Sequence, residues 1–294
     1  MKKQIFYISS ILILITILSI IIYPNLFPKQ EINEEYKNLE NEFNYEQIQY
    51  LIDNDIDLEN LKNYTKYKYF NVYDYFNYEN IRIHNNYTHL ESINSYRYPS
   101  YFTPYLNPKS AVFLETPMVL VNKSFYLESS FIPSNLVSVM DYEIEYMNSD
   151  IMVKKEVIES YETMYKDASK EGIEFALFSG FRSYKRQEYL FYNIYNDDTI
   201  SAKPGHSEHQ TGYALDISPR NVGLINELEN TTTYEWLINN SHKYGFILRF
   251  PKNKTNITTY QFEPWHFRYV GESASFIMEN SLTLEEYIFS YLEI

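Results

Sequence analysis

The chain has 294 residues, no cysteine and a formal net charge of −14 at pH 7. Without cysteine it has neither disulfides nor zinc–thiolate sites, so histidine and carboxylate side chains must hold any metal. The acidity argues against binding to nucleic acid or other anionic polymers by general charge attraction, and the length allows one sizeable core with additional segments.

The N-terminal segment has the pattern of a membrane anchor. Lys2 and Lys3 precede an uncharged, mostly apolar run of nineteen residues from Ile5 to Tyr23. At about 1.5 Å per residue, such a helix nearly spans a hydrocarbon core of about 30 Å. No small-residue cleavage site follows, which favours an uncleaved anchor over a cleaved signal peptide. We therefore expect residues 1–30 to form a cytoplasmic tip and a single transmembrane signal-anchor, with the rest of the chain extracellular.

Residues 31–110 are predicted to form a stalk and a small helical region. The stretch 31–50 is polar and acidic, whereas 48–87 is dense in tyrosine, phenylalanine, leucine and isoleucine at roughly helical spacing. This spacing predicts two or three short helices, and their aromatic residues suit helix packing better than stacking on sugars. Three prolines between 99 and 108 mark a linker, so a separate domain is expected over 111–294.

Helices come first along the chain and a small sheet with helices on one side follows, an order that predicts an α+β fold consisting of a small sheet with flanking helices. Helices are expected over 153–170, 184–195, 233–244, 272–279 and 284–292. Strands are expected over 118–123, 173–178, 213–217, 246–250 and 260–270.

Three side chains offer a metal site: His209, Asp216 and His266. A catalytic zinc needs three protein ligands and an open position for water. A lone histidine is more often structural, but four of the six histidines lie between 206 and 266. The pattern therefore indicates a zinc hydrolase. The two other histidines of this stretch have weaker claims: His206 as a residue of the cleft wall and His242 as a structural residue.

Three further residues are candidates for the chemistry. Glu263 precedes His266 by three positions, where a carboxylate can accept the proton of a metal-bound water. Arg182 carries a permanent charge that can bind a carboxylate or a developing oxyanion. Ser207 can hydrogen-bond a substrate group. Each has a plain alternative: Glu263 as a surface residue, Arg182 in a surface ion pair, and Ser207 as a residue that shapes its loop.

Three ordered motifs give the chain a family resemblance. They are S-G-F-R-S at 179–183, S-E-H-Q-T-G-Y-A-L-D at 207–216 and E-P-W-H-F-R-Y-V-G at 263–271. Together they resemble the VanY-type D-alanyl-D-alanine carboxypeptidases of the LAS metallopeptidase group, over about residues 115–294. The departures are Phe181, where tyrosine is common, and Tyr213, where leucine is common.

The resemblance implies an antiparallel sheet that carries a Zn²⁺ site. It assigns roles to six residues: His209, Asp216 and His266 as zinc ligands, Glu263 as catalytic general base and acid, Arg182 as catalytic and substrate-binding contact, and Ser207 as substrate-binding residue. The implied function is a zinc D,D-carboxypeptidase that removes the C-terminal D-alanine from peptidoglycan stem peptides ending in D-Ala-D-Ala.

Other functions remain open at this stage. A D-Ala-D-Ala dipeptidase or a wall endopeptidase would use the same motifs with a different cleft. A non-catalytic cell-wall-binding protein would keep zinc for structure only, but such a site normally has four protein ligands. An anchored scaffold that docks partners through residues 48–87 is compatible with catalysis.

Overall fold

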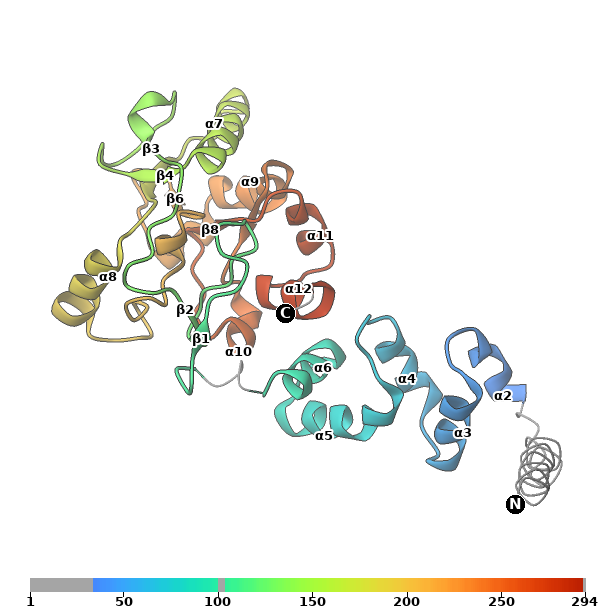
Figure 1. Ribbon diagram of the computed structural model, residues 1–294. Helices are drawn as coiled ribbons and strands as arrows, with labels where there is room; N and C mark the ends of the chain where they lie inside the picture. Colours follow the sequence, from blue (N-terminus) through green and yellow to red (C-terminus); the bar gives the residue numbers. More distant parts are fainter. Residues whose placement is uncertain (1–33, 100–103, 293–294) are drawn as a thin grey trace, which may run out of the picture. The chain divides into compact units, whose positions relative to one another are not determined.

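The computed structural model describes residues 34–99 and 104–292 (Figure 1). By its internal contacts the chain divides into two units, residues 1–61 and 62–294, and each is described by itself.

The first unit is helical. It contains α2 (Glu34–Lys37), the 3-10 turn η1 (Asn38–Asn41), α3 (Tyr45–Asp53) and the start of α4 (Leu58–Thr65). Asn44 caps α3 in a capping box with Gln47, because each side chain accepts a hydrogen bond from the other residue's backbone N–H. Ile48 and Leu51 form the buried side of this helix.

The predicted fold was wrong in including a transmembrane helix. Across residues 34–99 and 104–292, no helix combines the length and the apolar character needed to cross a membrane. Residues 1–30, where the anchor was expected, lie outside the described ranges. The prediction of membrane as a partner depended on that helix and loses its support with it.

The second unit begins with short helices, as the aromatic spacing predicted. These are η2 (Val72–Asp74), α5 (Tyr75–Asn85) and α6 (His89–Arg97). The ring of Tyr64 lies 5.9 Å from the ring of Tyr78 and 5.6 Å from that of Tyr75. The tyrosines of this region therefore pack helices together, as expected.

The C-terminal part of the second unit is built on a four-stranded antiparallel sheet with the order β5-β6-β8-β7. Its strands are β5 (Ala176–Ser179), β6 (Ala214–Ser218), β7 (Phe246–Leu248) and β8 (His266–Tyr269). Two smaller sheets accompany it. β3 (Leu136–Ser138) and β4 (Met152–Lys154) pair antiparallel, whereas β1 (Lys109–Ser110) and β2 (Phe125–Tyr126) pair parallel.

Helices and short turns surround this sheet (Figure 1). They are η4 (Val139–Asp141), α7 (Lys155–Lys170), α8 (Tyr184–Leu190), the π-helical turn η5 (Phe191–Tyr195), η6 (Glu208–Thr211), η7 (Asn226–Asn230), α9 (Thr232–Asn240), η8 (Ser241–Tyr244), η9 (Lys252–Lys254), α10 (Thr255–Thr258), α11 (Ser273–Glu279) and α12 (Leu284–Tyr291).

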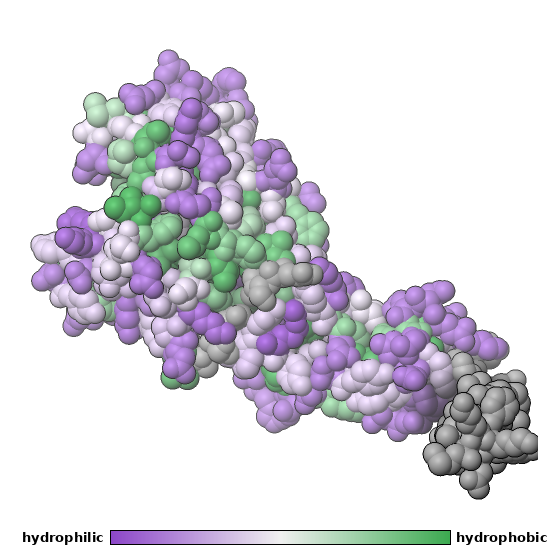
Figure 2. Space-filling model, in the orientation of Figure 1, coloured by the Kyte–Doolittle hydropathy of each residue, from purple (hydrophilic) through white to green (hydrophobic). Residues whose placement is uncertain are grey.

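The core lies between the sheet and α7. The predicted apolar face of this helix is buried at Val157, Tyr161, Met164 and Ala168, and it packs in one cluster with strand residues such as Leu215. Hydrophilic side chains cover much of the outer edge of the face drawn in Figure 2, and apolar residues gather nearer its middle. The α+β class and the antiparallel sheet are thus as expected.

Candidate metal centre

A tight turn brings the first two predicted ligands together. His209 lies in η6, and Gly212 ends this turn with a positive φ of 76°, a conformation that favours glycine. The chain then enters β6, which carries Asp216. Nε2 of His209 lies 3.3 Å from Oδ2 of Asp216. The seven-residue spacing of the motif is therefore one turn followed by a short strand.

The third ligand comes from the neighbouring strand. Asp216 of β6 and His266 of β8 are directly opposite in the antiparallel register, where facing side chains are close neighbours. Nδ1 of His266 lies 3.1 Å from Oδ1 of Asp216. One donor atom from each of His209, Asp216 and His266 lies within 4.8 Å of the other two, and all three residues are buried. The sheet thus assembles the predicted ligand set.

A backbone contact fixes the orientation of His209. Its Nδ1 lies 2.7 Å from the carbonyl oxygen of Gly180, which can only accept a hydrogen bond. The proton is therefore on Nδ1, and the lone pair of Nε2 points toward Asp216. Such a hydrogen bond to the second ring nitrogen is the usual way in which proteins orient a metal-ligating histidine.

The site is electrostatically prepared for a cation. Burial acts to raise the pKa of Asp216, but the neighbouring His209 and His266 outweigh it and hold this pKa well below its usual range. Burial lowers the pKa of His209. Burial also opposes protonation of His266, but the nearby carboxylates of Asp216 and Glu208 raise its pKa to about 9. An ionised carboxylate between two imidazoles is a donor set for a divalent ion, and the ion displaces the proton of His266 when it binds.

The spacing of the donors fits zinc. Zinc binds histidine nitrogen and carboxylate oxygen at about 2.0–2.2 Å, so neighbouring ligand atoms in a tetrahedral site are separated by about 3.3 Å. The 3.3 Å between Nε2 of His209 and Oδ2 of Asp216 agrees with this value, and Nδ1 of His266 lies 3.1 Å from the other carboxylate oxygen, Oδ1. Two imidazoles and one carboxylate also form a familiar three-ligand catalytic set.

A pocket of about 380 Å³ opens onto these ligands. Arg182, Ser207 and Glu263 line it, so the structure brings all six predicted site residues together. This volume is at the small end of the range for ligand sites, which suits the end of a short peptide. His206 also lines the pocket, as expected, whereas His242 lies in η8 and is not among the lining residues.

Glu263 is suited to proton transfer. Burial raises its pKa to about 7, although the nearby His266 opposes the shift. Its Oε2 lies 3.6 Å from Nδ1 of His266, beside the metal-ligand set. A carboxyl group with a pKa near neutrality can both accept and release a proton at the pH of the reaction.

Arg182 is held at the edge of the pocket by three contacts. Its guanidinium donates from Nη1 to Gln187 at 2.9 Å and from Nη2 to Ser179 at 3.2 Å. Its backbone N–H donates to the carbonyl oxygen of His209 at 3.0 Å. Both side-chain partners are neutral, so the positive charge of Arg182 is not cancelled by a hydrogen-bonded carboxylate.

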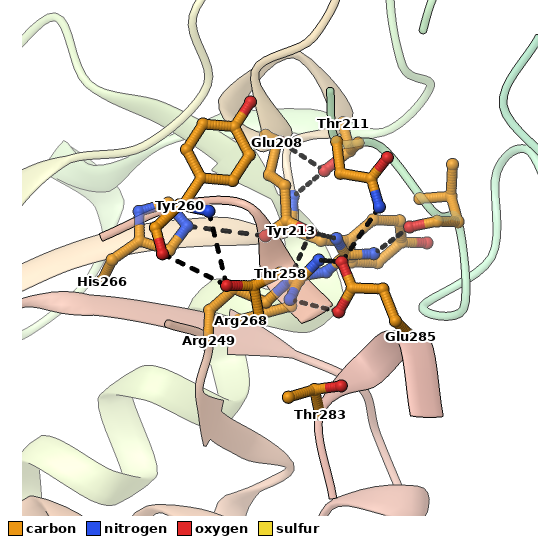
Figure 3. Close-up of polar contacts among 12 residues, drawn as sticks. Glu208, Thr211, Tyr213, Arg249, Thr258, Tyr260, His266, Arg268, Thr283 and Glu285 are labelled. Carbon is orange, nitrogen blue, oxygen red and sulfur yellow. Dashed lines mark hydrogen bonds and ion pairs between the residues drawn. The ribbon is translucent and has the colours of Figure 1, made fainter. Parts of the chain in front are cut away.

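Glu208 was not among the residues predicted from the sequence; it directly precedes His209 in η6 and contacts buried arginines (Figure 3). This glutamate is buried, its Oε2 is 3.5 Å from Nε2 of His266, and its Oε1 contacts Arg249 and Arg268. The only signal in the sequence was its position beside His209, because its partners lie 41 to 60 residues away.

The sequence matches known carboxypeptidases. Residues 150–272 match the family VanY, D-alanyl-D-alanine carboxypeptidase. YodJ of Bacillus subtilis (strain 168), provisionally named a carboxypeptidase, is 43% identical over 188 residues, which cover 59% of this chain and 67% of YodJ. The D-alanyl-D-alanine carboxypeptidase of Enterococcus faecium is 33% identical over 178 residues, 58% of this chain and 57% of that protein.

A solved structure extends the likeness to the fold. The LdcB LD-carboxypeptidase is 41% identical and superposes with a TM-score of 0.56, covering 65% of this chain and 97% of that chain. The donor set, the pocket and these similarities agree on one enzyme class. The chain belongs to the VanY family of D-alanyl-D-alanine carboxypeptidases and is a hydrolase with zinc as its cofactor.

Proposed function

We propose that this protein removes the C-terminal D-alanine from peptidoglycan stem peptides ending in D-Ala-D-Ala. The observation that carries the proposal is the meeting of a three-ligand metal set, Glu263 and Arg182 in one small pocket. The name of the Enterococcus faecium relative supports the substrate.

A bound metal and Glu263 have different roles in the proposed reaction. When bound, zinc supplies a Lewis acid for the scissile carbonyl and makes water a nucleophile near neutral pH. Glu263 takes a proton from the attacking water and returns it to the nitrogen of the departing D-alanine. Its raised pKa matches both steps, since the same group must accept and then donate.

Arg182 and Ser207 bind the substrate in this proposal. The uncancelled charge of Arg182 attracts the terminal carboxylate of the peptide or the oxyanion that develops during attack. Ser207, beside the ligand His209, lines the same pocket and offers a hydroxyl to the peptide. Since peptidoglycan lies outside the cell membrane, we also propose that residues 111–294 act there as the catalytic domain.

A second specificity has an observation in its favour. LdcB, with its TM-score of 0.56, is an LD-carboxypeptidase. Such an enzyme would release the terminal D-alanine of a tetrapeptide by cutting the peptide bond between an L-amino acid and that D-alanine. The metal, Glu263 and Arg182 would serve both reactions, so only the substrate side of the pocket distinguishes them.

The test is release of free D-alanine from two synthetic stem peptides, a pentapeptide ending in D-Ala-D-Ala and the corresponding tetrapeptide. We expect release from the pentapeptide with zinc, none with a chelator, and a loss of about 10²–10⁴-fold in kcat for Glu263→Gln. Glu227→Gln, at an exposed position, is the matched control.

Each alternative has its own outcome in this assay. Release from the tetrapeptide alone would replace the D,D specificity by the L,D specificity. Hydrolysis of the free dipeptide D-Ala-D-Ala, with neither stem peptide cut, would indicate a dipeptidase. Tight zinc binding without cleavage of either peptide would contradict the proposed activity.

A further inference from the structure

Two buried atoms face each other behind the metal-ligand set. Nε2 of His266 and Oε2 of Glu208 have no hydrogen-bond partner among the described residues, and they lie 3.5 Å apart. Unpaired buried polar atoms are rare because each costs desolvation energy. Here a proton on Nε2 would satisfy both atoms at once.

The other oxygen of Glu208 is already occupied. Its Oε1 accepts hydrogen bonds from Nε of Arg249 at 2.7 Å and from Nη1 of Arg268 at 2.8 Å (Figure 3). Both arginine side chains are fully buried. The two contacts fix the plane of the carboxylate and leave Oε2 directed at His266.

Groups further from His266 hold the two arginines in place. Glu285 of α12 accepts from both terminal nitrogens of Arg249, at 2.8 Å and 2.6 Å. Arg268 donates to the carbonyl oxygens of Pro117 and Val119 at 3.0 Å and 2.7 Å. The cluster of Glu208, Arg249, Arg268 and Glu285 is charge-neutral and buried, so its members hold one another rigidly.

The other ring nitrogen of His266 faces the metal-ligand set. Nδ1 is the nitrogen that faces Asp216, at 3.1 Å, and Glu263, at 3.6 Å. A metal ligand must offer a lone pair, so Nδ1 has to be unprotonated and the ring proton has to be on Nε2. The choice of tautomer is therefore decided on the Glu208 side.

We propose that Glu208 is a positioning residue for the metal centre: its carboxylate accepts the Nε2 proton of His266 and so presents the Nδ1 lone pair to zinc. The inference rests on the metal site of the proposed function but not on its substrate. A cluster built only for stability would use both carboxylate oxygens within itself, whereas here one oxygen is left for the ligand.

The replacement Glu208→Gln tests this directly because it keeps the shape of the side chain. The amide oxygen can still accept from the two arginines, which turns the NH₂ group toward His266. Nε2 must then accept, and the proton moves to Nδ1, where it competes with the metal. We expect zinc affinity to fall by about 10–100-fold, the usual effect of losing such a partner.

Glu285→Gln is the matched control. It removes one negative charge from the same buried cluster without touching His266. We expect this variant to lose stability but to keep its zinc affinity within about threefold of the wild type. Equal zinc affinity in Glu208→Gln and the wild type, or an equal loss in both variants, would overturn the proposal. No substrate is needed, so failure here is distinct from failure of the peptidase assay.

A measurement on the unmodified protein covers the case in which Glu208→Gln does not fold. Nitrogen-15 NMR of the zinc-loaded protein should show a protonated Nε2 and a metal-bound Nδ1 for His266. A metal-bound Nε2 would overturn the proposal, because Glu208 would then face no proton.

Discussion

At the scale of single residues, Glu263 makes stability depend on pH. Burial raises its pKa to about 7, so the folded protein holds this proton more tightly than the unfolded chain does. The metal-free protein should therefore lose stability as pH rises from about 4.5 through 7. The shift corresponds to at most about 3 kcal/mol, and partial exposure of the side chain makes about 1–3 kcal/mol the expected loss.

Urea unfolding in the presence of a chelator, at pH 5 and pH 8, measures this loss. Glu263→Gln lacks the titrating group, so its free energy of unfolding should change less over the same interval. If wild type and variant lose equal stability between the two pH values, the proton of Glu263 is not bound more tightly in the folded state.

The residue scale also shows what the sequence could predict. His209, Asp216 and Glu263 stand in dense local motifs, so their grouping was visible before the structure. The partners of Glu208 were not, because Arg249 and Arg268 come from different segments and meet it only in the folded core. A buried ion pair leaves no periodic pattern in the sequence. Nothing in the sequence around either arginine distinguishes it from an arginine on the surface.

At the scale of elements, the close packing of β4 against the turn after β5 supports the ligand His209. A Cβ atom on Gly180 would lie 2.5 Å from Cγ1 of Val153 and 2.6 Å from the backbone oxygen of Met152. The carbonyl of Gly180 is the group that orients His209. We expect Gly180→Ala to cost about 1–3 kcal/mol by overpacking and also to weaken zinc binding, because the carbonyl must shift.

Gly172→Ala is the control for this prediction. Gly172 has a φ of 76°, and a Cβ atom added there would have no neighbour within 4 Å, so alanine meets strain but no clash. It should cost about 1–2 kcal/mol and leave zinc affinity unchanged. Thermal unfolding and zinc titration of both variants separate the effects, and normal zinc affinity in Gly180→Ala would contradict the role given to its carbonyl.

Element boundaries were predicted less well than element types. The strand expected over 260–270 is limited to His266–Tyr269, since Pro264 has no N–H for a strand ladder. The stretch 118–123 forms isolated bridges in place of the expected strand, including Val112 with Leu120. Val119, Leu120 and Val121 of this stretch are buried, but burial alone does not specify pairing. Local apolar patterns thus predicted what is buried better than which backbone groups would pair.

At the scale of the whole molecule, the helix α6, which precedes the proposed catalytic domain, makes a buried and a partly buried contact with the last helix of that domain. Asn94 of α6 donates to Ser290 of α12 at 3.1 Å, and Arg97 donates to the carbonyl oxygen of Phe289 at 2.8 Å. α12 in turn supplies Glu285 to the buried charge cluster. The predicted boundary between residues 110 and 111 would cut α6 away from this helix.

We therefore expect a fragment of residues 111–294 to be less stable than residues 34–294. The shorter fragment loses the two hydrogen bonds, and α12 becomes exposed where α6 covered it. The free energy of unfolding should fall by at least about 2 kcal/mol, which lowers Tm by about 4–8 °C for a chain of this size. Zinc affinity should remain, because the ligands and the pocket residues all lie between 182 and 266. Arg97→Ala in the longer chain removes the Phe289 contact while keeping α6, and it should show a smaller decrease. Equal Tm values for both fragments would instead support 110/111 as a true domain boundary, with the helical region contributing something other than stability.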